Sequence, residues 1–82
     1  MTVTVLLFAS LAEAAGTRRV ILPHLQGDTV RAVVERLLTD YTTLRRFVPN
    51  LLYALDEEYV DDDATPVPPG STLALIPPVS GG

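Results

Sequence analysis

The sequence contains no cysteine, no lysine and no tryptophan, and its single histidine is His24. Without cysteine the chain has no disulfide, no thiolate metal site and no cysteine nucleophile. One histidine cannot assemble a histidine zinc site by itself, so no bound metal or other cofactor is expected. All six basic residues are arginines, and the protein therefore offers no side-chain amine for conjugation to itself.

Long hydrophobic runs and an excess of positive charge are also missing. No run of 18 apolar residues occurs, which predicts that no segment spans a membrane. The segment that begins at Met1 lacks the basic region and the apolar stretch of a signal peptide, so a cytoplasmic location is expected. The net charge of −4 disfavours nucleic acid as a partner.

The composition that remains suits one small folded domain. The chain has 82 residues, of which 48% are hydrophobic, and this argues against disorder. A domain of this size buries a modest core. We find no repeat, linker or low-complexity segment, so residues 1–82 are expected to form a single domain, with residues 77–82 as an extended tail.

Five segments have the composition of β-strands, rich in apolar and β-branched residues. In chain order, the predicted strands are residues 2–8, 17–22, 51–55, 59–60 and 72–76. The last strand has no charged residue on either face, which favours a central place in the sheet. A type II turn is expected just before it, with Pro69 and Gly70 at its centre.

Two segments have helical features. Apolar residues recur at helical spacing over residues 29–41, which predicts the main helix and a buried stripe, with Asp28 or Thr29 as the N-cap. Residues 10–16 match a capping box followed by a C-cap glycine, and residues 42–50 are expected to be irregular with one further turn. These elements predict an α+β fold, a mixed four- to five-stranded sheet with one main helix packed on one face.

The segment IPPVSGG at residues 76–82 is suited to present its final carboxylate to another protein. Pro77 and Pro78 lack backbone donors and favour extended geometry, so the sheet ladder must end there. An extended chain from Pro77 to Gly82 spans roughly 20 Å. Gly81 and Gly82 have no Cβ, which lets the backbone enter a narrow slot.

The whole chain resembles the ubiquitin-like sulfur carriers, and specifically the small subunits of molybdopterin synthase, which implies a β-grasp fold. The resemblance lies in the segments VTVLLFASLAEAAG, GDTVRAVVERLLTDY, ALDEEYV and PVPPGSTLALIPPVSGG. The chain departs from the family at Ala12, where arginine is common, at Asp56, where asparagine is common, and at Ser71, where aspartate is common. The change at Ala12 affects one polar contact to an activating enzyme.

The resemblance implies that Gly82 carries sulfur. A ubiquitin-activating-type adenylyltransferase would use ATP to adenylate the Gly82 carboxylate, and a persulfide-derived sulfur would convert it to a thiocarboxylate. The tail would then insert into the large subunit of a heterotetrameric synthase and give sulfur to a pyranopterin, which builds the molybdopterin dithiolene. The inserted residues would be Pro77, Pro78, Val79, Ser80 and Gly81. Catalytic side chains would lie on the partners, so the chain itself is not expected to be an enzyme.

The resemblance also places a partner near Phe8, Tyr59 and Ile76, although core positions or chance exposure would produce the same pattern. The acidic residues 56–63 are interpreted as a solvated turn, with steering of a basic partner as the alternative, and His24 as a loop residue. Other acceptors stay open, namely thiamine or cysteine synthesis, tRNA thiolation, and protein lysines. The alternative of another class is a β-grasp binding module whose tail has no chemistry.

Overall fold

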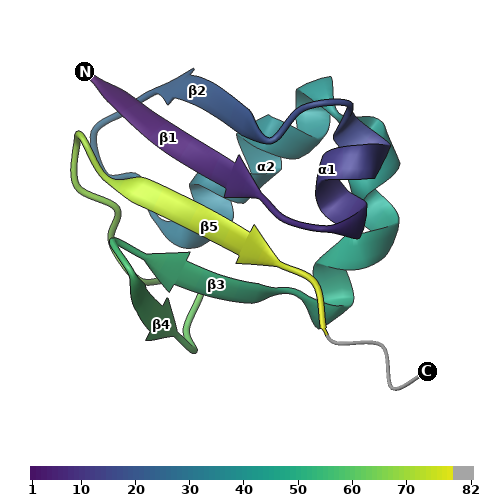
Figure 1. The fold of residues 1–82 in the computed structure, drawn as a ribbon. Coiled ribbons are helices and arrows are strands. Elements are labelled where there is room, and N and C mark those ends of the chain that lie inside the picture. Colours follow the sequence, from purple (N-terminus) through teal and green to yellow (C-terminus); the bar gives the residue numbers. More distant parts are fainter. Residues whose placement is uncertain (79–82) are drawn as a thin grey trace.

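The computed structural model describes residues 1–78, and in it a five-stranded sheet forms one layer and helices form the other (Figure 1). The strands are β1 (Thr2–Leu7), β2 (Arg19–Pro23), β3 (Leu52–Leu55), β4 (Glu58–Val60) and β5 (Thr72–Ile76). The helices are α1 (Ser10–Ala15), α2 (Val30–Asp40) and the 3-10 segment η1 (Thr42–Asn50). The predicted α+β class is confirmed.

The sheet has the order β2-β1-β5-β3-β4, and β5 is central as expected. It runs parallel to β1 and antiparallel to β3, with Leu75 beside Leu7 and Ile76 beside Leu52. The carboxyl ends of β1 and β5 therefore meet the start of β3 at one end of the sheet. We call this the tail end, and we call the other end, where Asp56 adjoins Thr72, the hairpin end.

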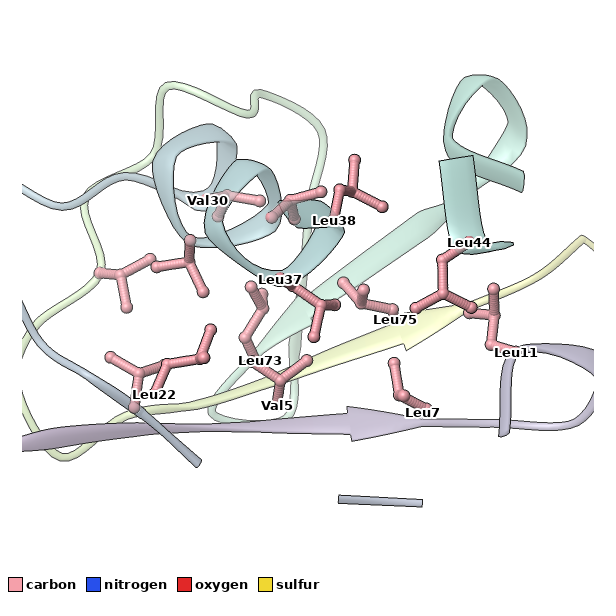
Figure 2. Close-up of a cluster of buried hydrophobic side chains, with 14 residues drawn as sticks. Val5, Leu7, Leu11, Leu22, Val30, Leu37, Leu38, Leu44, Leu73 and Leu75 are labelled. Atoms are coloured by element: carbon pink, nitrogen blue, oxygen red, sulfur yellow. The ribbon is translucent and has the colours of Figure 1, made fainter. Parts of the chain in front are cut away.

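The core lies between the sheet and α2. Side chains along each strand point alternately to the two faces of the sheet, and on neighbouring strands the apolar ones point to the α2 face together. Val5, Leu7, Leu73 and Leu75 are each at most 2% exposed and face the helix layer. The buried helical side chains that meet them are Leu11, Val30, Val33, Val34, Leu37, Leu38 and Leu44 (Figure 2). Tyr41, the last residue of the predicted apolar stripe, is only partly buried, because α2 ends at Asp40.

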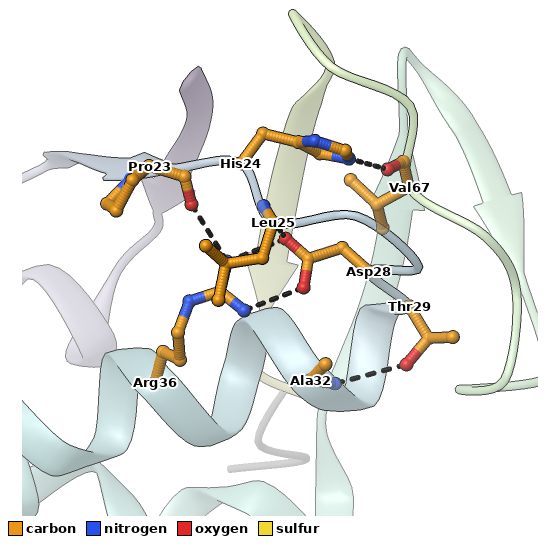
Figure 3. Close-up of polar contacts among 8 residues, drawn as sticks. All are labelled: Pro23, His24, Leu25, Asp28, Thr29, Ala32, Arg36 and Val67. Atoms are coloured by element: carbon orange, nitrogen blue, oxygen red, sulfur yellow. Dashed lines mark hydrogen bonds and ion pairs between the residues drawn. The ribbon is translucent and has the colours of Figure 1, made fainter. Parts of the chain in front are cut away.

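Of the two predicted caps of α2, Thr29 is the one that the structure uses. Its hydroxyl oxygen accepts a hydrogen bond from the amide of Ala32 at 3.2 Å (Figure 3). This contact satisfies one of the donors that a helix start leaves free. Asp28 is buried beside the cap and binds Arg36 instead.

The predicted capping box of α1 is wrong. Ser10 is the first residue of the helix, the N-cap position belongs to Ala9, and no side chain caps the start. The pattern failed because the turn after β1 begins the helix one residue earlier than a capping serine requires. The predicted C-cap is confirmed, since Gly16 is left-handed with φ +76° and its amide donates to Ala12 at 2.9 Å.

Several element boundaries also differ from the sequence prediction, and the contacts explain two of these differences. The 3-10 segment η1 is longer than the single turn expected, and the hydroxyl of Thr43 binds the carbonyl of Ala14 at 3.0 Å. Strand β2 begins at Arg19, because Thr17 closes a small turn by hydrogen bonds to that residue. None of the helices in residues 1–78 has the length and apolar character needed to cross a membrane.

Each of the two turns that flank the sheet at the hairpin end contains at least one residue with a positive φ. Gly70 has φ +83° and the amide of Ser71 donates to Pro68 at 3.3 Å, in agreement with the predicted type II turn. The β3–β4 loop is the pair Asp56 and Glu57, with φ values of +48° and +72°. This combination is typical of the two-residue turn that matches strand twist.

Candidate functional site

The root of the predicted tail lies where β5 leaves the sheet. The last ladder pair joins Ile76 to Leu52, after which Pro77 is partly buried and Pro78 is exposed. Since proline has no amide hydrogen, the ladder cannot continue past Ile76. The other predicted tail residues, Val79, Ser80, Gly81 and Gly82, lie outside the described part of the chain.

The sheet face opposite α2 carries apolar side chains together with Thr2, Thr4, Arg19 and Thr72, and within residues 1–78 no helix covers it (Figure 1). Its residues alternate with the core residues of the same strands and therefore point the other way. We call this surface the open face, and its apolar residues are Leu6, Ile21, Leu52, Ala54, Tyr59, Ala74 and Ile76. Ile21, Leu52 and Tyr59 are more than half exposed, and exposed apolar side chains that lie on one face favour an interaction site there.

The structure brings two of the three predicted partner residues to the same place. Phe8 is 44% exposed and follows β1 one position beyond the Leu7–Leu75 pair, so it lies at the tail end with Ile76. Tyr59 is 72% exposed on the edge strand β4, two strands away from β5, and also belongs to the open face.

Two open-face residues, Leu52 and Ile21, were missed by the sequence analysis. They are 51% and 57% exposed, and Leu52 is the direct neighbour of Ile76. The pairing register of the strands identifies such residues. Tyr53 and Leu55 pair with the inward-facing leucines of β5, so Leu52, which precedes Tyr53, points to the opposite face. In the apolar run LLYAL the two faces cannot be told apart without that register.

A surface groove adjoins the open face at the tail end. It lies between the end of β1 and α1 and has a volume of about 750 Å³. Its lining includes Leu6, Phe8, Ala12, Glu13 and Arg18. The groove combines apolar and charged groups, and its lining includes Ala12, one of the positions at which the chain departs from the family that it resembles.

The strongest polar cluster lies away from this site, where the loop after β2 meets α2 (Figure 3). Arg36 forms two hydrogen bonds of 2.7 Å with the carboxylate of Asp28 and a third, of 2.9 Å, with the carbonyl of Pro23. The hydrogen bonds from Arg36 hold the pKa of Asp28 below its ordinary value, although burial acts against them. The pKa of Arg36 is raised by the same contact.

His24 is a loop residue, as predicted, and its ring has a structural contact. The Nε2 atom lies 2.7 Å from the carbonyl oxygen of Val67, which belongs to the loop before β5. The amide of Val67 in turn donates to the carbonyl of Asp28 at 2.9 Å. These contacts tie two loops together and place no reactive pair of side chains near the tail end.

The acidic residues 56–63 are exposed or partly exposed, and the turn expected there is formed by Asp56 and Glu57, after which Glu58–Val60 form strand β4. Asp62 accepts from the amide of Ala64 at 2.9 Å, and Asp63 forms an ion pair of 2.6 Å with Arg31. Asp56 accepts from the amide of Thr72 at 2.9 Å. In the part of the chain that the structure describes, no three His, Cys, Asp or Glu side chains are grouped to hold a metal ion.

Comparison with known proteins gives matches over nearly the whole chain. The ThiS family model matches residues 5–82. The molybdopterin synthase sulfur carrier subunit of Arabidopsis thaliana is 35% identical over 98% of this chain and 82% of its own length. The human protein of the same description is 32% identical, with 98% and 93% covered.

Solved structures agree with the fold. SAMP1 of Haloferax volcanii superposes with a TM-score of 0.89 at 29% identity, and each chain is covered completely. Subunits 1 and 2 of molybdopterin-converting factor from Helicobacter pylori have been solved as a complex, and the matching chain has a TM-score of 0.71 at 22% identity with complete coverage of both chains. The ubiquitin-like β-grasp fold is confirmed, and the chain belongs to the ThiS family, with the small subunits of molybdopterin synthase among its relatives.

Proposed function

We propose that this chain is the sulfur carrier subunit of a molybdopterin synthase. The observation that carries the proposal is the similarity, over 98% of this chain, to two proteins of that description from Arabidopsis thaliana and human. The match to the family model runs through Gly82, so it includes the tail as well as the domain.

The proposed chemistry takes place on the carboxylate of Gly82. An ATP-dependent activating enzyme adenylates it with release of pyrophosphate, which turns a poor leaving group into a good one. The terminal sulfur of a persulfide then attacks the acyl carbon and displaces AMP, which leaves an acyl disulfide between Gly82 and the sulfur donor. A second thiol attacks the donor-side sulfur of this acyl disulfide, so a thiocarboxylate is released on Gly82 and a disulfide forms on the donor. The carrier supplies the acyl group and its delivery, while the partners supply the catalytic side chains. No bound cofactor is needed on the carrier for these steps.

The proposed synthase partner is a large subunit that takes up the tail and binds the open face. The root of the tail at Pro77 and the exposed side chains of Phe8 and Leu52 lie at the same end of the sheet. A partner that covers this end receives the tail beside an apolar contact area. The complex of subunits 1 and 2 from Helicobacter pylori is a precedent within the fold.

The proposal is tested by the mass of the intact protein. Native protein with a free C-terminus is incubated with the activating enzyme, ATP and a sulfur donor. The expected mass increase equals the difference between one sulfur and one oxygen, and it is localised to Gly82 by fragmentation. The activating enzyme is first shown to add sulfur to the carrier that it normally serves. If that active enzyme produces no mass increase in this chain, the proposal is contradicted. The same spectrum of untreated protein checks that Gly82 is the last residue.

A second candidate function is protein modification. SAMP1 of Haloferax volcanii, described as a small archaeal modifier protein, is similar over the complete chain. Both functions begin with adenylation of Gly82 and differ in the acceptor. Transfer to a pyranopterin in a reconstituted synthase supports the first, whereas isopeptide-linked conjugates in native extracts support the second. Thiamine or cysteine synthesis and tRNA thiolation are distinguished in the same way by the acceptor.

A further inference from the structure

Four arginines, Arg18, Arg19, Arg45 and Arg46, gather at the tail end. All four are exposed, and none forms a salt bridge within residues 1–78. The two remaining arginines are engaged elsewhere, Arg31 with Asp63 and Arg36 with Asp28. The positive charge that is available to a partner is therefore concentrated in these four residues.

Arg18 and Arg19 reach the tail end through the β1–β2 pairing. Arg19 lies opposite Leu6 in the ladder, and the carbonyl of Arg18 accepts from the amide of Leu7 at 2.9 Å. Both arginines therefore lie beside the end of β1 that precedes Phe8. Arg18 also lines the groove that contains Phe8.

Arg45 and Arg46 reach the same end through η1. This segment is held to α1 by the Thr43–Ala14 hydrogen bond, and it leads into Leu52, which pairs with Ile76. The guanidinium of Arg46 lies 5.0 Å from the centre of the Phe47 ring, a cation–π distance that helps to fix its position.

Negative charge is concentrated at the opposite end. The β3–β4 turn contributes Asp56, Glu57 and Glu58, next to Thr72 at the start of β5. At the tail end Glu13 shares the groove with Arg18. A chain with a net charge of −4 thus has four exposed arginines without a salt bridge in residues 1–78, and they lie at the end of the sheet opposite the acidic β3–β4 turn.

We infer that the four arginines form a docking surface for a carboxylate-rich segment of the activating enzyme, beside the opening that receives the tail. The inference rests on the proposed function and adds the chemistry of the partner surface. Carboxylates of the activating enzyme around its tail-binding opening would attract the four arginines. This attraction orients the carrier so that its tail faces the opening on first contact, which raises the association rate. The net charge of −4 disfavours a polyanion such as tRNA as the ligand, because the chain as a whole repels phosphates.

The test measures association rate constants with the activating enzyme by stopped flow over a range of ionic strengths. The variants are Arg18→Gln and Arg45→Gln, while Arg46 is left in place because it stacks on Phe47. We expect each variant to associate about 2- to 5-fold more slowly at low salt and to match the wild type near 1 M salt, where charges are screened. The matched control is Gln26→Glu, which makes the same change in net charge in the exposed loop after β2.

The outcomes separate this inference from the proposed function. If Gly82 of the wild-type protein never gains sulfur, the proposed function fails. If it gains sulfur but the arginine variants associate as fast as the wild type at low salt, or Gln26→Glu slows association equally, the docking inference alone is wrong. Saturable binding of a labelled tRNA that is lost in the arginine variants also overturns it, in favour of a nucleic acid ligand.

Discussion

Ala9 has φ +52° and ψ −124°, a backbone conformation that residues with a Cβ rarely adopt. It occupies the second position of a turn in which the amide of Leu11 donates to the carbonyl of Phe8 at 3.0 Å. Glycine is favoured at this position because it lacks a Cβ. We expect Ala9→Gly to increase the free energy of unfolding by about 1 kcal/mol, net of the greater freedom of glycine in the unfolded chain.

Urea denaturation measures this change, and Gly70→Ala is the matched control. Gly70 has φ +83° with nothing within 4 Å of the site where a Cβ would be added, so backbone strain alone opposes alanine there. Gly70→Ala should therefore lower the midpoint. If Ala9→Gly lowers it as well, the turn after β1 is not strained in the way that its dihedral angles indicate.

Asp28 should make stability depend on pH. The pKa of its carboxyl lies below the ordinary 3.8, chiefly because Arg36 donates hydrogen bonds to it. A group with a lowered folded-state pKa stabilises the protein above its unfolded pKa, and the contribution is lost as pH falls through the folded pKa. We expect Asp28→Asn to cost about 2 kcal/mol near neutral pH and progressively less below pH 3.8.

The comparison requires urea midpoints of wild type and variant at several pH values. Asp63→Asn is the control, since Asp63 forms an exposed ion pair with Arg31. Exposed pairs contribute little because water screens them. A cost of Asp28→Asn that stays constant down to strongly acidic pH would show that packing, rather than charge, explains the effect.

At the scale of elements, the sequence predicts best where one pattern is sustained. The apolar positions of α2 repeat over three turns, and Val30, Val33 and Leu37 are fully buried as expected. The central place of β5 was also predictable. Its sequence has no charged residue, as expected for a strand that is paired on both edges. Long patterns average over local exceptions, so they predict these two elements correctly.

The elements that sequence reasoning misjudged are decided by single contacts. Nothing in the alanine at position 9 signals a turn, so the start of α1 was assigned to a capping serine that has no capping hydrogen bond. The length of η1 depends on Leu44, which is fully buried, and on the bond from Thr43 to α1. Such contacts join residues far apart in the chain, and local periodicity does not contain them.

The open face should be the binding surface for the large subunit. We expect Phe8→Glu, Ile76→Glu and Leu52→Glu each to weaken binding by about 2 kcal/mol or more, since a charge would be buried in an apolar contact. Isothermal titration measures the loss. Phe8 and Leu52 are about half exposed, so their replacement should leave the unfolding midpoint nearly unchanged, whereas Ile76 is more buried and needs that check most.

Leu25→Glu is the control for the open face. Leu25 is 50% exposed in the loop after β2 and is not on the open face. The variant should bind the large subunit as the wild type does. Equal losses for Leu25 and for the open-face residues would mean that added negative charge, and not the apolar contact, explains the weaker binding.

At the scale of the whole molecule, the proposed function gives the domain and the tail separate tasks. The domain ends its ladder at Ile76, and Phe8, Leu52 and the segments that carry the four arginines lie at the same end of the sheet, whereas Tyr59 lies farther away on the edge strand β4. The sequence predicted the tail from Pro77 onward but not this arrangement. The arginines come from residues 18–19 and 45–46, and only the folded topology brings those segments together.

A bulky residue at Gly81 should separate delivery from folding. Gly81→Val leaves the carboxylate of Gly82 in place but adds a branched Cβ that must pass through the partner's slot. We expect sulfur transfer in the reconstituted synthase to fall by on the order of 100-fold, because misplacement of the reacting group by about 1 Å is enough for such a loss. Unfolding by urea should be unchanged. Transfer at the wild-type rate would contradict the narrow slot.

Gly82 itself provides the most decisive test, because the proposed chemistry needs its carboxylate to be both free and terminal. Deletion of Gly82 moves the carboxylate back by one residue, and addition of one alanine after it replaces the carboxylate with an amide bond. We expect both variants to gain no sulfur from the activating enzyme, ATP and donor, as measured by intact mass. The core ends at Leu75, so both variants should keep the wild-type urea midpoint and still bind the large subunit through the open face. If either variant gains sulfur at the wild-type rate, the sulfur is carried elsewhere and the proposed function is wrong. Loss of binding together with loss of sulfur would instead show that the tail, rather than the open face, supplies most of the affinity.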